Sequence, residues 1–306
     1  MNKITEKLLS IVSDYKGSFD GAYNIREDGG CAARQSTKNI LIESKRDAPG
    51  LVVNILPSAH KEKVFIPACV THSGVDDLVY NDFYVGEGAD VEIIAGCGVM
   101  SEGEEEARHN GVHRFFVGKG ARVVYREKHI GVGKGKGARR IDPVTDVVLQ
   151  EDAVLEMDTV QIGGVDSTFR KTTAKLAPRA RLIIRESLLT EARQSAKTDF
   201  VVDLNGEDSG VYLISRSVAR DNSRQEYRSI IRGNARCTGH SECDAILVGN
   251  GTVSAAPELY AGDIDAALIH EAAIGKIAGE QILKLRTFGL TEEQAEEKII
   301  AGFLRG

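Results

Sequence analysis

The chain has 306 residues, of which 42% are hydrophobic, and a formal net charge of −6 at neutral pH. It is long enough to bury a sizeable core. Its charges are mixed rather than gathered into a basic patch, which argues against a nucleic-acid partner. No apolar run reaches the roughly 18 residues of a membrane helix, and the start, MNKITEKLLS, lacks a signal-peptide core. We expect a cytoplasmic protein with no membrane partner.

Three regions follow one another along the chain. Residues 3–15 carry apolar side chains at helical spacing, so we predict an N-terminal helix and lead-in over 1–37. Over 38–275, short runs of Val, Ile and Leu alternate with polar residues and are separated by glycines. This pattern is typical of many strands joined by tight turns. Residues 276–306 return to helical spacing.

A loose repeat runs through the strand region. GEGADVEII, GKGARVVYR, QEDAVLEMD and APRARLIIR each combine a turn, an alanine and an alternating apolar strand. Their alanines, at 89, 121, 153 and 180, are spaced 32, 32 and 27 residues apart. A sandwich would repeat its strands about every 8–12 residues without this longer period. The repeat therefore predicts a mainly β fold, a parallel β-helix with a helical segment at each end.

Two amphipathic helices are predicted after the strand region, at 278–289 and 291–304. Thr291 and Gln294 have the spacing of a capping box at the start of the second helix. The apolar stripe of that helix either caps the last coil or docks a partner. It includes Ile299, Ile300, Phe303 and Leu304.

Two charged loops and two histidines interrupt the strands. GVGKGKGARR, at 131–140, lacks the G-x-x-x-x-G-K-[ST] spacing of a phosphate loop, so we interpret it as a solvated basic loop. SEGEEE, at 101–106, is interpreted as a solvated acidic loop. His109 and His113 precede the strand-like FFVGKG and, taken alone, are interpreted as surface histidines.

The cysteines are widely spaced and form no C-x-x-C pair. An odd number in a reducing compartment predicts free thiols rather than disulfides. The spacing argues against a closed four-thiolate zinc site, so any metal is expected to have mixed thiolate, imidazole and carboxylate ligands. The five are Cys31, Cys69, Cys97, Cys237 and Cys243.

One candidate for mixed ligation lies near the end of the strand region. Cys243 is in ECDAILVGNG, and His270 and Glu271 follow about one coil later in ALIHEAAIGKI. Residues one coil apart in a β-helix stack at roughly 4.8 Å, which would allow the three side chains to converge. The alternative is structural: a buried thiol, a hydrogen-bonded histidine and a carboxylate near a helix start.

The most distinctive motifs are SVARDNSRQEYRSII, ECDAILVGNG and the ending HEAAIGKIAGEQILKLRTFGLTEEQAEEKIIAGF. With VEIIAGCGVMSE, His109 and FFVGKGARVVY upstream, they resemble the SufB/SufD family, the scaffold proteins of the Suf iron–sulfur cluster assembly system. The resemblance covers roughly 85–306 and is much weaker over the first 80 residues. The chain is also shorter than the long bacterial members.

The resemblance implies a right-handed parallel β-helix that forms a dimer with itself or with a SufD-like subunit. Its C-terminal helices would dock on a SufC-type ABC ATPase. Carried over by position, Cys243, Glu271 and His270 match groups linked to a transient iron–sulfur cluster, and Cys97 matches the cysteine that takes sulfur from a donor protein. Cys243 and Glu271 together favour a SufB-like chain, although Ile269 stands where the SufB pattern has a glutamate.

The expected function is therefore a non-enzymatic scaffold for iron–sulfur cluster assembly, with ATP hydrolysis supplied by a partner subunit. Two alternatives stay open. The first is a SufD-like partner that supports assembly without holding the cluster. The second is a β-helix enzyme acting on carbohydrate or acyl groups, against which the absence of tryptophan and of a catalytic carboxylate array argues.

Overall fold

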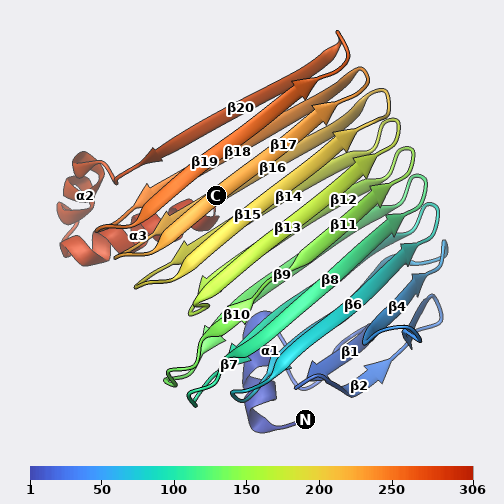
Figure 1. Cartoon of the computed structure of the whole chain (residues 1–306), viewed down its shortest axis with the longest axis horizontal. Helices are drawn as coiled ribbons and strands as arrows, with labels where there is room; N and C mark the ends of the chain where they lie inside the picture. Colours follow the sequence, from blue (N-terminus) through green and yellow to red (C-terminus); the bar gives the residue numbers. More distant parts are fainter. Residues whose placement is uncertain (306) are drawn as a thin grey trace.

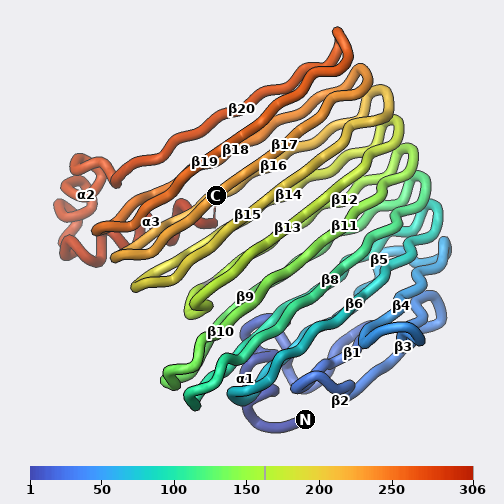
Figure 2. Tube along the Cα trace, viewed as in Figure 1, coloured from blue at the N-terminus to red at the C-terminus, as the bar shows by residue number. Residues whose placement is uncertain are grey.

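The computed structural model describes residues 1–305 and shows a parallel β-solenoid of about eight turns with helices near both ends (Figure 1). Within these residues, twenty strands form two sheets of ten, which we call sheet A and sheet B. From β4 onward the chain alternates between the two sheets, with β10 and β11 both in sheet B, and each pair of crossings adds one coil (Figure 2). The predicted mainly β solenoid with helical ends is confirmed.

The two sheets have the following strand orders. Sheet A consists of β2 (Gly30–Gln35), β1 (Ala22–Glu27), β5 (His60–Val70), β7 (Asp90–Met100), β9 (Arg122–Val132), β12 (Val154–Gly163), β14 (Arg181–Thr190), β16 (Ser209–Ala219), β18 (Cys237–Leu247) and β20 (Ala266–Gly275). Sheet B consists of β19 (Thr252–Ala261), β17 (Arg224–Gly233), β15 (Ser195–Leu204), β13 (Ser167–Leu176), β10 (Arg139–Ile141) with β11 (Val144–Leu149), β8 (Ala107–Val117), β6 (Asp76–Val85), β4 (Gly50–Ile55) and β3 (Ile40–Ser44).

The repeated alanines occupy equivalent corners, as the sequence predicts. Ala89, Ala121, Ala153 and Ala180 are all fully buried. The carbonyl oxygen of Ala89 accepts a hydrogen bond from the next coil at 2.8 Å, and those of Ala121 and Ala153 do so at 2.9 Å. Side chains then alternate between the lumen and the outer face, because successive residues of a strand point to opposite sides.

The N-terminal region differs from its prediction in one respect. Helix α1 (Lys3–Val12) is present and packs on the outer face of sheet A, where a Cβ on Gly96 would lie 2.4 Å from the Val12 carbonyl oxygen. The hairpin β1–β2, however, is already part of the sheet, since β1 pairs in parallel with β5. The β-sheet therefore begins at residue 22 and not at the predicted boundary of 38.

The two charged loops stack on each other at one corner, one coil apart. Lys136 lies 3.3 Å from Glu104, so basic and acidic segments neutralise each other. The glycines permit this close stacking: a Cβ on Gly137 would lie 1.9 Å from the Glu105 carbonyl oxygen. The glycine-rich motif thus serves backbone packing between loops.

The C-terminal helices are α2 (Gly279–Arg286) and α3 (Glu292–Arg305), close to the predicted ranges. The capping box is confirmed by reciprocal hydrogen bonds of 3.0 and 3.2 Å between Thr291 and Gln294. No helix among residues 1–305 has the length and apolar character needed to span a membrane.

The apolar stripe of α3 faces the solenoid. Ile300 is buried, whereas Ile299, Phe303 and Leu304 are half-buried, and the Leu304 carbonyl oxygen accepts a hydrogen bond from Ser187 of β14. This stripe therefore packs on the side of sheet A over β14 and β16 and does not cover the last coil.

We predict that Ala121→Leu lowers the free energy of unfolding by about 1–3 kcal/mol, because the added atoms do not fit between stacked coils. Arg122→Leu, at the next and exposed position, is the control and should change it by less than about 0.5 kcal/mol. Urea unfolding of both variants measures the difference. Equal stability of the two variants would contradict tight packing at this corner.

Candidate functional site

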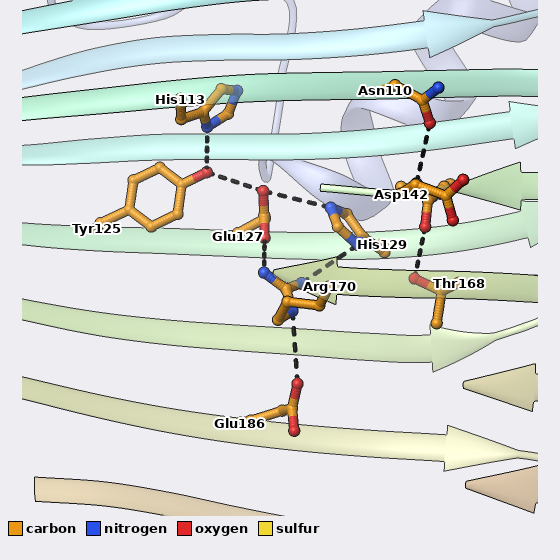
Figure 3. A network of polar contacts seen from close by, with 10 residues as sticks. Asn110, His113, Tyr125, Glu127, His129, Asp142, Thr168, Arg170 and Glu186 are labelled. Carbon is orange, nitrogen blue, oxygen red and sulfur yellow. Dashed lines mark hydrogen bonds and ion pairs between the residues drawn. The ribbon is translucent and has the colours of Figure 1, made fainter. Parts of the chain in front are cut away.

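A chain of polar side chains runs inside the solenoid between its apolar layers (Figure 3). His113 Nδ1 lies 2.8 Å from the Tyr125 hydroxyl, which donates a 2.8 Å hydrogen bond to Glu127. Arg170 donates to the other Glu127 oxygen at 2.7 Å and lies 3.4 Å from Glu186. All five side chains are buried. We call this set of residues, with those that continue it below, the polar axis.

The polar axis continues towards the C-terminal coils. Glu186 accepts hydrogen bonds from Thr198 at 2.9 Å and from Ser215 at 2.8 Å. Further along the lumen, the Ser241 hydroxyl lies 3.0 Å from the Tyr227 hydroxyl and 2.9 Å from that of Ser229. Polar groups therefore line the lumen over most of its length.

Buried charge on the polar axis is held by pairing. Burial acts to raise the pKa of the Glu127 carboxyl, but His129 and Arg170 outweigh it and hold this pKa well below its usual range. Burial also lowers the pKa of His113 to about 4, so its imidazole is neutral at neutral pH. Because removing one partner of a buried ion pair costs roughly 3–5 kcal/mol, these groups depend on one another.

Cys97 lies at the N-terminal end of the polar axis. It faces the lumen from β7, is 5% exposed, and is in register with His129 on β9. Burial raises the pKa of its thiol well above the ordinary value. Cys97 therefore sits inside the solenoid, with α1 over the outer side of its strand.

The histidines interpreted as surface residues are both buried. His109 is 2% exposed and its Nδ1 lies 3.0 Å from Asp77, which also pairs with Arg26 at 2.6 Å. His113 belongs to the polar axis described above. The surface interpretation was wrong because buried and exposed side chains alternate along β8. His109 and His113 both occupy buried positions in this alternation, on the lumen side of the strand.

Cys243 and His270 lie at the other end of the lumen. Along β18 and β20, Ser241 pairs with His270 and Cys243 with Ala272, so Cys243 and His270 point to the same inner face. Cys243 is buried, and its thiol pKa is raised to about 12, chiefly by burial and then by the Glu186 and Asp244 carboxylates. His270 Nδ1 is buried without a hydrogen-bond partner among the described residues.

Glu271 departs from the expected convergence. It pairs with Glu242 across the strands and points outward, where its carboxylate lies 3.4 Å from His240 Nε2. Adjacent residues of one strand face opposite sides, so His270 and Glu271 do not share a face. Across the described residues, no group of three or more His, Cys, Asp or Glu side chains is placed to hold a metal ion.

All five cysteines are free within the described chain, as predicted. Sequence reasoning missed most of the polar axis. The sequence pattern that could have revealed the polar axis is a charged residue at an inward position of an otherwise apolar strand. Examples are Glu127 in β9, Arg170 in β13 and Glu186 in β14.

Fold and site define a parallel β-solenoid that carries buried thiols near both ends of a polar lumen. A family model described as the SufBD core domain of the SUF system for iron–sulfur cluster assembly matches residues 80–303. This chain belongs to that family, the SufBD family of iron–sulfur cluster assembly proteins.

Curated relatives agree with this assignment. An iron–sulfur cluster assembly SufBD family protein of Methanothermobacter thermautotrophicus is 28% identical over 276 residues, which cover 86% of this chain and 64% of the relative. One of Methanocaldococcus jannaschii is 26% identical, covering 88% of this chain and 86% of the relative. One of Pyrococcus horikoshii is 30% identical over 76% of this chain and 69% of the relative. The chain thus spans less than two thirds of the Methanothermobacter protein.

We predict that stability falls as the pH is lowered from 6.5 towards 4. The unfolded chain protonates His113 below pH 6.5, whereas the folded pKa is about 4, so His113 favours unfolding in this window. Its contribution is about 3 kcal/mol. Urea unfolding of His113→Asn, which retains a donor towards Tyr125, should show a shallower loss over this range. Identical pH dependence in the parent and variant would contradict a neutral buried His113.

Proposed function

We propose that this chain is a scaffold subunit for iron–sulfur cluster assembly in the cytoplasm, without catalytic turnover of its own. The observation that carries the proposal is the polar axis, which lies between Cys97 and the end of the lumen that Cys243 and His270 both face. Five strand spacings separate the two thiols in sheet A, or roughly 24 Å. Membership of the SufBD family supports the same role.

In this proposal, sulfur from a donor protein arrives at Cys97 as sulfane sulfur. An external two-electron reductant such as a dithiol converts it to sulfide, which combines with iron at Cys243. The cluster is the cargo of the scaffold and its type is left open. Thiolate is the soft ligand that iron–sulfur chemistry favours, and iron binding would displace the proton from a thiol of raised pKa. The single imidazole of His270 would hold the cluster less firmly than additional thiolates would, and this weaker ligation favours release of the cluster.

A second subunit is expected at the C-terminal end of the solenoid. β19 and β20 are the last strands of their sheets, and each leaves a ten-residue edge without a strand partner in the described chain. Such long edges favour pairing with another chain. Ile269, 56% exposed, and Tyr260, 58% exposed, add apolar surface there. Either a second copy or a SufD-like subunit would bring the additional ligands that one chain lacks.

One observation favours the alternative of a SufD-like accessory subunit. Glu271 faces outward, so this chain presents fewer inward ligands than the resemblance implied. Ile269, which replaces the glutamate of the SufB pattern, lies on the same outer face and adds no ligand there. In that case the partner subunit would hold the cluster.

We predict that Cys243→Ser abolishes cluster formation on anoxic reconstitution with iron and a sulfur donor. His270→Ala should lose part of the cluster, and Glu271→Ala should lose less than Cys243→Ser because its side chain leaves the inner face. Cys31→Ser, at an exposed thiol, is the control. Visible absorption and Mössbauer spectra measure the cluster. A Cys243→Ser protein with the cluster content of the parent would show that Cys243 is not the cluster site. A parent protein that assembles no cluster on its own would support the accessory role.

We also propose that an ABC-type ATPase docks on α2. Leu283 is 62% exposed and Phe288, just after α2, is 75% exposed. Leu283 lines a groove of about 520 Å³ between α2 and the end of β18. A mobile ATPase bound here would act close to the strand that carries His270, because β20 leads directly into α2 (Figure 1).

The double variant Leu283→Asp/Phe288→Asp should lose co-purification with an ABC-type ATPase by at least about tenfold, because charge enters an apolar contact. Leu41→Asp, at an exposed leucine of the distant β3, makes the same change and should retain binding. Retained binding in the double variant would place the ATPase elsewhere.

A further inference from the structure

A small cavity lies beside the Cys97 side chain. Its volume is about 20 Å³, which is room for one water-sized atom. Polar groups gather on its wall, and one of them, the Asn81 Oδ1 atom, is buried without a hydrogen-bond partner in the part of the chain described. The polar lining residues, with the thiol, are Cys97, His109, His113, Asn24, Arg26 and Asn81.

His109 is held rigidly at this cavity. Its Nδ1 lies 3.0 Å from Asp77 Oδ2, and Asp77 is fixed in turn by Arg26 through contacts of 2.6 and 2.8 Å. Because the acceptor is a carboxylate, Nδ1 carries the proton and Nε2 has the lone pair. The result is an imidazole whose basic nitrogen is free to face the cavity.

The two other histidines around Cys97 are already engaged. His113 Nδ1 contacts Tyr125, and its Nε2 packs so closely against β8 that a Cβ on Gly111 would lie 2.9 Å away. His129 does not line the cavity: its Nε2 forms an ion pair with Glu127 at 3.3 Å without a hydrogen bond of good geometry, and its Nδ1 lies 3.5 Å from Arg170. Only His109 therefore combines a carboxylate on one nitrogen with a second nitrogen left for the cavity.

Cys97 needs such a base. Burial raises the pKa of its thiol, and the Glu127, Cys69 and Asp77 side chains raise it further, while Arg170 lowers it. A buried thiol is a weak nucleophile until a neighbouring group accepts its proton. The titratable groups around Cys97 on the lumen side are Asp77, His109, His113, Glu127, His129 and Arg170, whereas Cys69 lies on the outer face of sheet A under α1.

We propose that His109, positioned by Asp77, is the base for the Cys97 thiol, and that the cavity receives the single sulfur atom which Cys97 acquires. This inference rests on the proposed role of Cys97 as sulfur acceptor and adds the residue that makes it reactive. The unpartnered Asn81 oxygen then accepts a hydrogen bond from the terminal S–H of the product.

The step balances with a persulfide as co-reactant. His109 Nε2 takes the Cys97 proton, and the thiolate attacks the terminal sulfur of the incoming persulfide. A new S–S bond forms on Cys97 while the S–S bond of the persulfide breaks. Its electron pair leaves with the donor sulfur, which receives the proton from His109. One sulfane sulfur is transferred, and no external oxidant or reductant is required.

The test uses the full-length, reduced protein under anoxic conditions without iron or ATPase. Two small probes are applied: inorganic polysulfide, read as one added sulfur on the Cys97 peptide by mass spectrometry, and methyl methanethiosulfonate, read as the labelling rate. His109→Asn keeps a donor towards Asp77 but removes Nε2. Asp77→Asn keeps His109 but removes the charge that orients it. His72→Gln, at an exposed histidine, is the matched control.

At neutral pH, His109→Asn should react at Cys97 about 100-fold more slowly than the parent, with recovery at alkaline pH where the thiol ionises unaided. Asp77→Asn should lose about tenfold. Labelling of Cys69, a buried thiol on the neighbouring β5, serves as the internal measure of intact packing and should stay the same.

An unchanged rate and pH profile at Cys97 in His109→Asn, with Cys69 labelling as in the parent, would overturn the proposal. If Cys69 labels faster in His109→Asn than in the parent, the packing of that variant is disturbed, and the rate and pH profile of Cys97 in Asp77→Asn then decide the question. Failure of the scaffold function is a separate result: His109-dependent labelling without later cluster formation would reject the scaffold and leave this inference standing.

Discussion

In-register stacking of parallel strands is the constraint on which the rest of this protein depends. Each inward residue lies about 4.8 Å from the inward residue at the same place in the next coil. The corner alanines keep this spacing, because a larger side chain at Ala121 or Ala153 would push the coils apart. Given that register, Cys97 must lie on His129, and Ser241 must lie beside His270. A shift by one residue would turn all of them to the outer face.

The same stacking makes a polar lumen possible. A single buried Glu127 would be costly, since an isolated carboxylate in an apolar core is strongly disfavoured. Arg170 on the opposite sheet reaches both Glu127 and Glu186, at 2.7 and 3.4 Å, and neutralises them across coils. Buried charge is thereby concentrated between the two thiol regions, in a lumen lined by groups that can accept or donate protons.

The two ends of the solenoid are unlike each other. At the first coils, α1 covers the outer face of sheet A, and Asn24 and Arg26 of β1 help to line the Cys97 cavity. At the last coils, β19 and β20 present unpaired edges, and α3 covers only the neighbouring β14 and β16. A closed end suits chemistry that must exclude water. An open end suits assembly with a second subunit and passage of a cargo.

The sequence by itself determined the solenoid, its corner alanines and its C-terminal helices, because turn residues, periodicity and capping are local properties of the chain. Only the tertiary structure decided which side chains point into the lumen and which of them pair with each other. Glu271 is next to His270 in sequence and was expected to join it, yet strand alternation sends it outward. His109 and His113 were taken for surface residues, yet both enter the lumen. The pairing of Glu127 with Arg170, 43 residues apart, depends on how coils stack across two sheets, which no local pattern specifies.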